Sequence, residues 1–325
     1  MAKPALMITG SMLPLIDNGV EPAFEVHRLP AAESERAAFL ATVGPRLEAI
    51  ATGTMTGVKT SAEMIAQCPK LRIIANFGVG YDSVDVGAAA ARGVIVTNTP
   101  DVLTEEVADT TLGLLIGTVR EFWKAENWLR DGSWGKKGDY RLTPGSLRGR
   151  KVGIAGLGRI GKAIAKRCEA FGLEISYYGR SKQGDVPYAY HADLVSLARA
   201  VDTLIIATPG GGGTAKMVNG AVLEALGPTG VLINISRGST VDEPALIDAL
   251  RRNVIMAAGL DVFMNEPKPD PAFLRLDNVM LLPHVGSASV HTRNGMGQMV
   301  VDNLAAFAAG KPPISPVAET PFKGW

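Results

Sequence analysis

The chain has 325 residues, which exceeds the usual size of a single hydrophobic core, so two domains are expected. Its formal net charge is +1, and the small basic group at Arg148, Arg150 and Lys151 does not indicate a nucleic-acid surface. Its 46% of apolar residues is ordinary for a globular protein. These values exclude a nucleic-acid binder and favour a globular protein of two domains.

The cysteines and the hydropathy pattern indicate in which cellular compartment the protein works. Cys68 and Cys168 are too few and too far apart for a disulfide framework or a metal cluster, which suits a reducing cytoplasm. The first residues lack the pattern of a secretory signal, and no stretch of about 18 apolar residues predicts a membrane span. We expect a soluble, cytoplasmic protein with no metal and no membrane partner.

Short apolar runs alternate with helical patterns in the first hundred residues. Strands are predicted at 4–9, 49–52, 72–76 and 94–98, with helices at 61–67 and 84–92. Strands that alternate with helices in this way are typical of a parallel sheet covered on both faces.

A second array of strands and helices begins at Lys151. Its six predicted strands lie in KVGIAG, EISYYG, TLIIAT, GVLINIS, IMAAGLDV and VMLLPH. The apolar spacing over 101–130 predicts one long helix between the arrays, and a second long helix is predicted over 287–309. The tail at 314–325 is expected to return to the first array. Two doubly wound α/β domains are therefore predicted.

The strongest local motif is a glycine-rich turn between the strand at Lys151 and an apolar-periodic helix. Gly156, Gly158 and Gly161 have the spacing GxGxxG: the first makes a tight turn, the second lets the backbone approach a pyrophosphate, and the third lets helix and strand pack closely. The helix N-terminus offers unpaired N–H groups to the same anion. The turn, which also contains Leu157, Arg159 and Ile160, predicts dinucleotide binding.

The end of the next strand predicts which dinucleotide is bound. NAD enzymes usually have an acidic residue there for the ribose 2′-hydroxyl, but this strand is followed by Gly179, Arg180 and Ser181. The planar guanidinium of Arg180 and the hydroxyl of Ser181 suit a 2′-phosphate. We expect NADP(H) as the cofactor, with NAD(H) as a weaker one.

Three polar residues follow strands of the second array. Arg237 follows LINIS, Glu266 follows GLDVFMN, and His284 directly follows VMLLP. Ligands of open α/β sheets bind at the carboxyl ends of strands, and a histidine can exchange a proton near neutral pH. His27, His191 and His291 lack such a position. We predict that Arg237, Glu266 and His284 form a catalytic set.

An ordered series of motifs resembles the D-isomer-specific 2-hydroxyacid dehydrogenases over nearly the whole chain. The segments are NFGVGYDSVDV, TNTPDVLTEEVADTTLGLL, GIAGLGRIGKAIAKR, LINISRG, AAGLDVFMNEP and LLPHVGSAS. Among subgroups the chain looks most like the glyoxylate/hydroxypyruvate reductases. The resemblance implies a flavodoxin-like substrate domain, residues 1–100 plus 287–325, into which a Rossmann-like dinucleotide-binding domain, residues 101–286, is inserted.

The same resemblance implies a role for each matching residue. Arg237 would bind the carboxylate of a small 2-ketoacid and polarise its keto oxygen, and His284 would donate the proton. Glu266 would orient His284 and favour its imidazolium form. The backbone N–H groups of Val79 and Gly80 would complete the carboxylate site. Further cofactor contacts are implied at Thr208, Pro209, Ile235, Asp261, His284 and Gly286.

Alternatives to an NADPH-dependent ketoacid reductase remain open at this point. One is an NAD-dependent D-2-hydroxyacid or phosphoglycerate-type dehydrogenase, and another is a dinucleotide-sensing corepressor without turnover. A homodimer is expected, because the helix at 101–130 is broadly apolar and carries Trp123 and Trp128. Trp134 is interpreted either as a core residue or as a contributor to a neighbouring subunit's site. The Gly210 to Gly213 run departs from the family pattern.

Overall fold

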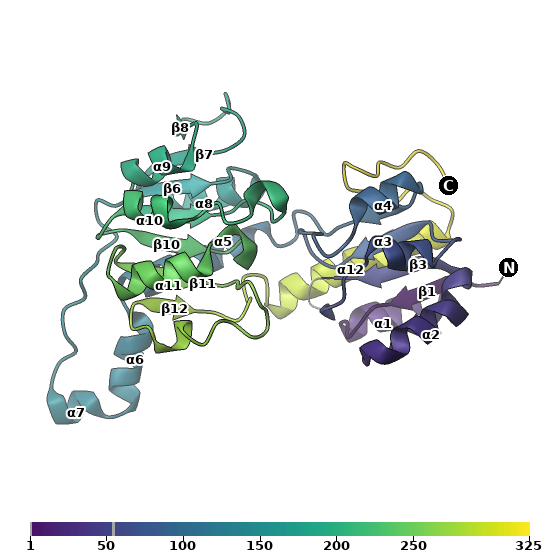
Figure 1. Cartoon of the computed structure of the whole chain (residues 1–325), viewed down its shortest axis with the longest axis horizontal. Helices are drawn as coiled ribbons and strands as arrows, with labels where there is room; N and C mark the ends of the chain where they lie inside the picture. The colour runs from purple at the N-terminus through teal and green to yellow at the C-terminus, as the bar shows by residue number, and fades with distance from the viewer. Residues whose placement is uncertain (1, 54–55) are drawn as a thin grey trace. The chain divides into compact units, whose positions relative to one another are not determined.

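Two parallel sheets organise the chain in a computed structural model, which describes residues 2–53 and 56–325 (Figure 1). Contacts divide the chain into two units, Met1–Leu103 with Ser289–Trp325, and Thr104–Ala288. Each sheet pairs its strands in parallel throughout, so the predicted α/β class with two doubly wound domains is confirmed. Among the described residues, no helix combines the length and apolarity that a membrane crossing needs.

The first unit has the strand order β2-β1-β3-β4-β5, which is that of the flavodoxin-like fold. Its strands are β1 (Ala5–Ile8), β2 (Glu25–Arg28), β3 (Leu47–Thr52), β4 (Ile73–Asn76) and β5 (Ile95–Thr97). Its helices are α1 (Pro14–Val20), α2 (Glu33–Val43), α3 (Ala62–Ala66), α4 (Val86–Ala91) and α12 (Val290–Ala308). Met7, Ile50 and Ile74 pack with α2, α3 and α4 in one core, while α12 packs against α1 and β4.

The C-terminal tail returns to this first sheet, as predicted. Val317 N donates to Val96 O at 2.9 Å, and the Thr320 hydroxyl accepts from Val96 N at 2.9 Å. Trp325 packs edge-to-face against Phe307 of α12, with ring centroids 4.8 Å apart. The outer strand β5 is therefore covered by residues that lie more than 200 positions later in the sequence.

The second unit has the strand order β12-β11-β10-β9-β6-β7-β8. Its strands are β6 (Lys151–Ala155), β7 (Glu174–Tyr178), β8 (Ala189–His191), β9 (Thr203–Ile206), β10 (Val231–Asn234), β11 (Ala257–Leu260) and β12 (Val279–Leu281). Helices α5 (Thr104–Val119), α8 (Arg159–Ala170), α9 (Leu194–Ala200), α10 (Gly220–Leu226) and α11 (Glu243–Arg251) cover it. The order reverses between β6 and β9, which is where a Rossmann-type sheet binds its dinucleotide.

The single helix predicted over 101–130 is wrong, because two helices occupy that stretch. α5 ends at Val119 and α6 (Phe122–Arg130) begins after Glu121, whose φ of 52° is left-handed. The buried Glu121 carboxylate accepts hydrogen bonds from Arg141, Tyr140 and Lys124. These partners hold the chain in a turn that the apolar spacing does not reveal. With α7 (Ser133–Lys137), α6 forms an arm on the second unit (Figure 1).

Two short strands, β2 and β8, are absent from the sequence prediction. Both lie at the edge of a sheet, and their side chains are exposed or half-buried. An edge strand need not be apolar, because one side of it faces solvent. The prediction therefore identified the more apolar strands, with β5 and β12 at the opposite edges among them, and missed these two polar edge strands.

Candidate active site

The glycine-rich turn joins β6 to α8 as the motif predicts. Gly156 has φ of 95°, and a Cβ there would lie 2.8 Å from Ala207 O and Thr208 N. A Cβ at Gly161 would collide with the carbonyl oxygen of Gly156. A Cβ at Gly158, by contrast, would meet nothing within 4 Å. The first and third glycines therefore allow close packing, and the second leaves the backbone open at the start of α8, which fits a dinucleotide pyrophosphate.

The turn after β7 is tied to the glycine-rich turn by Gln183. Its Nε2 donates to Leu157 O at 2.9 Å, and its backbone N donates to the Tyr177 hydroxyl at 2.7 Å. Tyr177 is fully buried, whereas Arg180 and Ser181 are exposed. The two side chains that are predicted to contact the cofactor thus lie on a turn that these hydrogen bonds hold in place. Sequence reasoning missed Gln183, because its contact joins segments that are far apart in the chain.

The three predicted catalytic residues follow three neighbouring strands. Arg237 follows β10, Glu266 follows β11, and His284 follows β12, and these strands are adjacent in the sheet. His284 Nδ1 lies 2.7 Å from Glu266 Oε2. The other carboxylate oxygen of Glu266 accepts from Phe263 N at 2.9 Å. One carboxylate therefore orients the imidazole while being fixed by the backbone.

The electrostatics of this site favour the ionised form of Glu266. Burial by itself raises the pKa of Glu266, but the hydrogen bonds from His284 and Phe263 N and the charges of His284 and Arg237 outweigh burial and lower it. The Glu266 side chain is 31% exposed and that of His284 is 36% exposed. Because Nδ1 is engaged by Glu266, Nε2 is the ring nitrogen left to exchange a proton with a substrate.

Asp261, at the end of β11, holds the loop that carries His284. Its Oδ1 accepts from Val285 N at 2.7 Å and its Oδ2 from Gly286 N at 2.8 Å, while its backbone oxygen accepts from His284 N at 2.9 Å. His284 has a left-handed φ of 54°, an uncommon conformation outside glycine. Burial raises the pKa of Asp261, and the two backbone N–H donors and the charge of His284 oppose that rise. Asp261 therefore stabilises the conformation of the histidine loop.

The family model for the "D-isomer specific 2-hydroxyacid dehydrogenase, NAD binding domain" matches residues 112–286, a range that contains the glycine-rich turn and all three strand-end residues. This chain belongs to the D-isomer specific 2-hydroxyacid dehydrogenase family. Among its relatives is the glyoxylate/hydroxypyruvate reductase A HPR2 of Arabidopsis thaliana, 43% identical over 93% of this chain and 95% of that protein. The hydroxyphenylpyruvate reductase of Plectranthus scutellarioides is 46% identical over 86% of this chain and 88% of that protein.

Solved structures share the fold of this dehydrogenase. The NADPH-dependent glyoxylate/hydroxypyruvate reductase of Sinorhizobium meliloti, in complex with NADP and malonate, is 52% identical, with a TM-score of 0.93 over 99% of this chain and 98% of that one. A 2-hydroxyacid dehydrogenase from Ketogulonicigenium vulgare is 44% identical, with a TM-score of 0.90 over 98% and 99% of the two chains.

The remaining cofactor residues predicted for this dehydrogenase lie after β9 and β10. The Ser236 hydroxyl donates to Thr208 O, which links the ends of the two strands beside Pro209 and Ile235. A Cβ at Gly210 would lie 2.7 Å from Arg237 Cγ. The first glycine of the Gly210 to Gly213 run therefore leaves room for the Arg237 side chain.

The other histidines lie on other elements of the two units. His27 is on β2, with Nε2 3.0 Å from Glu25 Oε1, and His191 ends β8, with Nδ1 3.3 Å from Ser196 Oγ. His291 is in α12. Within residues 2–53 and 56–325, no group of three or more potential ligands gathers as a metal site would require.

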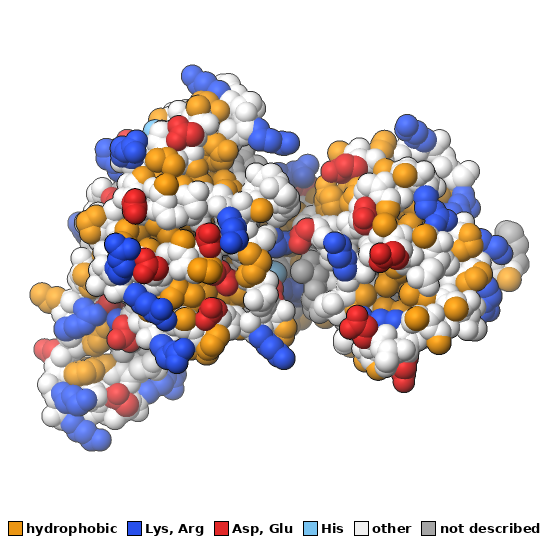
Figure 2. Space-filling model, viewed as in Figure 1, with side chains coloured by type: hydrophobic (Ala, Val, Ile, Leu, Met, Phe, Trp, Pro, Cys, Tyr) orange, Lys and Arg blue, Asp and Glu red, His pale blue; other side chains and the backbone are white. Residues whose placement is uncertain are grey.

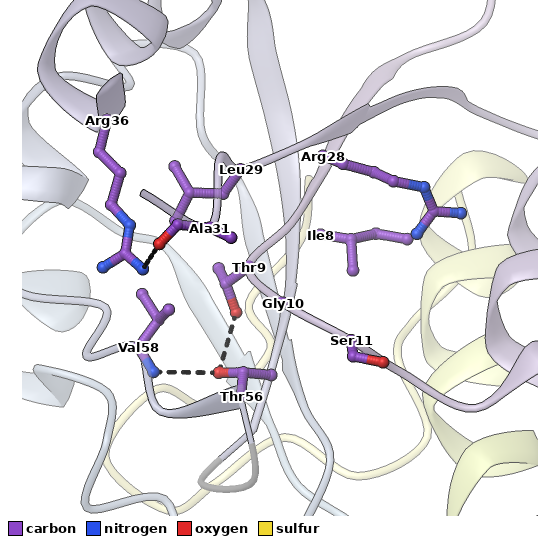
Figure 3. A pocket seen from close by; sticks show the side chains of 10 residues that line it. All are labelled: Ile8, Thr9, Gly10, Ser11, Arg28, Leu29, Ala31, Arg36, Thr56 and Val58. Atoms are coloured by element: carbon purple, nitrogen blue, oxygen red, sulfur yellow. Dashed lines mark hydrogen bonds between the residues drawn. The ribbon is translucent and has the colours of Figure 1, made fainter. Parts of the chain in front are cut away.

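A small cavity of about 340 Å³ opens at the carboxyl ends of β1 and β2 in the first unit (Figure 3). Threonine hydroxyls lie close together here: that of Thr9 is 2.9 Å from that of Thr52 and 3.3 Å from that of Thr56, and Thr56 donates to Gly53 O. The Arg36 guanidinium donates to Pro30 O and Ala31 O. These polar atoms already have protein partners, and none of the predicted site residues lines the cavity.

Proposed function

We propose that this dehydrogenase reduces small 2-ketoacids, glyoxylate and hydroxypyruvate among them, to 2-hydroxyacids with NADPH. The observation that carries the proposal is the His284–Glu266 pair, 2.7 Å apart and beside Arg237, at the carboxyl ends of adjacent strands in a sheet with a dinucleotide turn. Relatives whose names state glyoxylate or hydroxypyruvate reduction support the substrate class.

NADPH supplies the hydride when it is bound, and the protein supplies position, charge and a proton. The open backbone at Gly158 and the N-terminus of α8 suit the pyrophosphate, and Arg180 with Ser181 suits the 2′-phosphate. The NADP in the Sinorhizobium meliloti structure supports this choice of cofactor. NAD(H) is expected to serve less well, because it lacks the phosphate that Arg180 would bind.

The chain's own residues complete the reaction on the substrate. Arg237 binds the ketoacid carboxylate and polarises the keto oxygen, and His284 Nε2 donates the proton that makes the hydroxyl group. Glu266 keeps His284 oriented and favours its protonated form. The N–H groups of Val79 and Gly80 donate hydrogen bonds to the substrate carboxylate, so residues 1–100 plus 287–325 serve as the substrate domain and 101–286 as the cofactor domain. Thr208, Pro209, Ile235, Asp261 and Gly286 are assigned to the cofactor's ribose and nicotinamide portions.

The test of this function is a matrix of kcat/KM for several ketoacids with NADPH and with NADH. We expect turnover of glyoxylate and hydroxypyruvate, with NADPH preferred. A preference for NADH would favour the NAD-dependent alternative. Negligible turnover of every ketoacid, with retained dinucleotide binding, would favour the corepressor alternative.

We also propose a homodimer in the cytoplasm. The arm of α6 and α7 exposes hydrophobic side chains (Figure 2). Leu129 is 57% exposed and Trp134 is 58% exposed. Trp134 is thus not a core residue, and the arm is a surface that a second subunit would cover. Trp134 would then lie against the neighbouring subunit. Cys68 and Cys168 are buried and unpaired, which suits a reducing compartment.

A further inference from the structure

The loop after β4 has its carbonyl oxygens held by an asparagine side chain. Asn76 is the last residue of β4, and its Nδ2 donates to Gly78 O at 3.1 Å and to Gly80 O at 3.1 Å. Asn76 is 1% exposed, so these bonds are shielded from water. One amide group therefore fixes two carbonyls of a three-residue loop.

A second asparagine fixes the carbonyl between them. Asn98 Nδ2, just after β5, donates to Val79 O at 2.9 Å, and Thr99 N adds a bond to Gly78 O at 3.0 Å. β4 and β5 are neighbours in the sheet, so both asparagines reach the loop from adjacent strand ends. All three carbonyl oxygens of Gly78, Val79 and Gly80 are thus bonded within the first unit.

The amide oxygen of Asn76 shows that the residue is retained for its N–H donor. Its Oδ1 is buried and has no hydrogen-bond partner in the part of the chain that the structure describes. The amide cannot be turned over to satisfy Oδ1, because both partners of Nδ2 are carbonyl acceptors. An unsatisfied buried acceptor destabilises the folded protein. The donor end of Asn76 is therefore retained for the loop despite that cost.

The hydrogen bonds to these carbonyls also fix the direction of the N–H groups, because each C=O and the following N–H belong to one planar peptide unit. In a trans peptide the C=O and the following N–H point in opposite directions. Fixing Gly78 O therefore sets the direction of Val79 N–H, and fixing Val79 O sets that of Gly80 N–H. These are the two N–H groups assigned to the substrate carboxylate.

We propose that Asn76 and Asn98 are positioning residues that aim the N–H groups of Val79 and Gly80 at the carboxylate of the ketoacid. The proposal rests on the proposed function and extends it to residues that do not touch the substrate. Two donors held in place before binding lose little freedom when the anion arrives, which favours its affinity. Any ligand with a planar carboxylate should benefit, including an unreactive dicarboxylate such as oxalate.

The test replaces each asparagine with the isosteric aspartate, Asn98→Asp and Asn76→Asp, in the full-length protein with NADPH. A carboxylate oxygen would then face the loop carbonyls and repel them, so the peptides should rotate. We expect the oxalate inhibition constant and the glyoxylate KM to rise about tenfold to a hundredfold, the effect of misplacing a hydrogen bond to a charged group. NADPH affinity should change less than twofold, and kcat should fall less than KM rises.

The pH dependence separates positioning from simple damage. The loop carbonyls that face the new carboxylate disfavour its charged form and should raise its pKa. The protonated acid regains one O–H donor, so the oxalate affinity of Asn98→Asp should approach that of the wild type as the pH falls from 8 to 5. Tyr81→Phe is the matched control, because it removes a hydrogen bond of the same segment, from the Tyr81 hydroxyl to Glu319, and leaves the three carbonyls bonded. It should keep wild-type oxalate affinity.

The activity of the wild-type enzyme distinguishes a failure of the proposed function from a failure of the positioning role. If the wild type reduces no ketoacid, the proposed function fails. If the wild type is active but a folded Asn98→Asp binds oxalate within twofold of wild type at pH 8, the positioning role is wrong. The same holds if its affinity loss is unchanged at pH 5. If Asn98→Asp does not fold, the same criteria apply to Asn76→Asp, and failure of both to fold assigns the asparagines to stability and overturns the proposal.

Discussion

Glu266→Gln should change the pH dependence of ketoacid reduction more than its maximal rate. The substitution keeps the shape of the side chain but removes a negative charge 2.7 Å from His284 Nδ1. The carboxylate and the protonated imidazole stabilise each other, as the lowered pKa of Glu266 shows from the carboxylate side. Without the charge, the pair loses this mutual stabilisation, so activity should fade at a lower pH than in the wild type.

The size of the effect follows from the geometry of the pair. A hydrogen bond between charged groups is worth about 1.5–3 kcal/mol. Because the two side chains are 36% and 31% exposed, solvent screening favours the lower end, about 1.5 kcal/mol. One pH unit corresponds to about 1.4 kcal/mol, so the alkaline limb should move down by about one unit.

The assay is kcat/KM for glyoxylate with saturating NADPH, measured across the pH range. Glu243→Gln is the matched control, since Glu243 is a neighbouring carboxyl that accepts from Met264 N and not from His284. We expect its alkaline limb to coincide with that of the wild type. An unmoved limb in Glu266→Gln would refute the reasoning, as would retention of more than about a tenth of kcat in His284→Ala, where a loss of about a hundredfold or more is expected.

Four further outcomes are expected. Arg180→Asp should weaken NADPH binding about tenfold to a hundredfold and spare NADH, so an unchanged ratio of the two dissociation constants would exclude Arg180. Asp261→Asn should lower kcat through the His284 loop, with a smaller change in glyoxylate KM, which steady-state kinetics will show. Glu121→Gln should cost about 1–3 kcal/mol in urea unfolding. Because hydrogen bonds from Arg141 and Tyr140 outweigh burial and lower the Glu121 pKa in the folded protein, its charge stabilises at neutral pH, and that difference should vanish as the pH falls through the lowered value. Light scattering at micromolar concentration should show a mass near twice 34.2 kDa, whereas a monomer alone would contradict the dimer.

The main strands and the strand-end residues could be predicted because both depend on local pattern and simple topology. Arg237, Glu266 and His284 each follow a buried strand, and carboxyl ends of parallel strands share one edge of a sheet. That argument places residues on an edge but does not give distances. The 2.7 Å contact between His284 and Glu266 became visible only with coordinates.

What sequence reasoning missed depends on contacts between distant segments. The break at Glu121 contains neither glycine nor proline, and its cause is a carboxylate captured by Arg141 and Tyr140 some twenty residues later. Likewise, the roles of Asn76 and Asn98 depend on which carbonyls their amides reach. Residue type alone does not reveal such a role.

The joining of both chain ends in one unit has a consequence for synthesis on the ribosome. Folding proceeds as the chain emerges, and domains generally fold as units. Thr104–Ala288 is complete once residue 288 has left the exit tunnel, whereas the first unit still lacks α12 and the C-terminal tail that covers β5. Residues 2–103 are therefore made before the second unit but should reach their final packing after it. During that interval the face of the first sheet that α12 later covers is open to chaperones and to unwanted association.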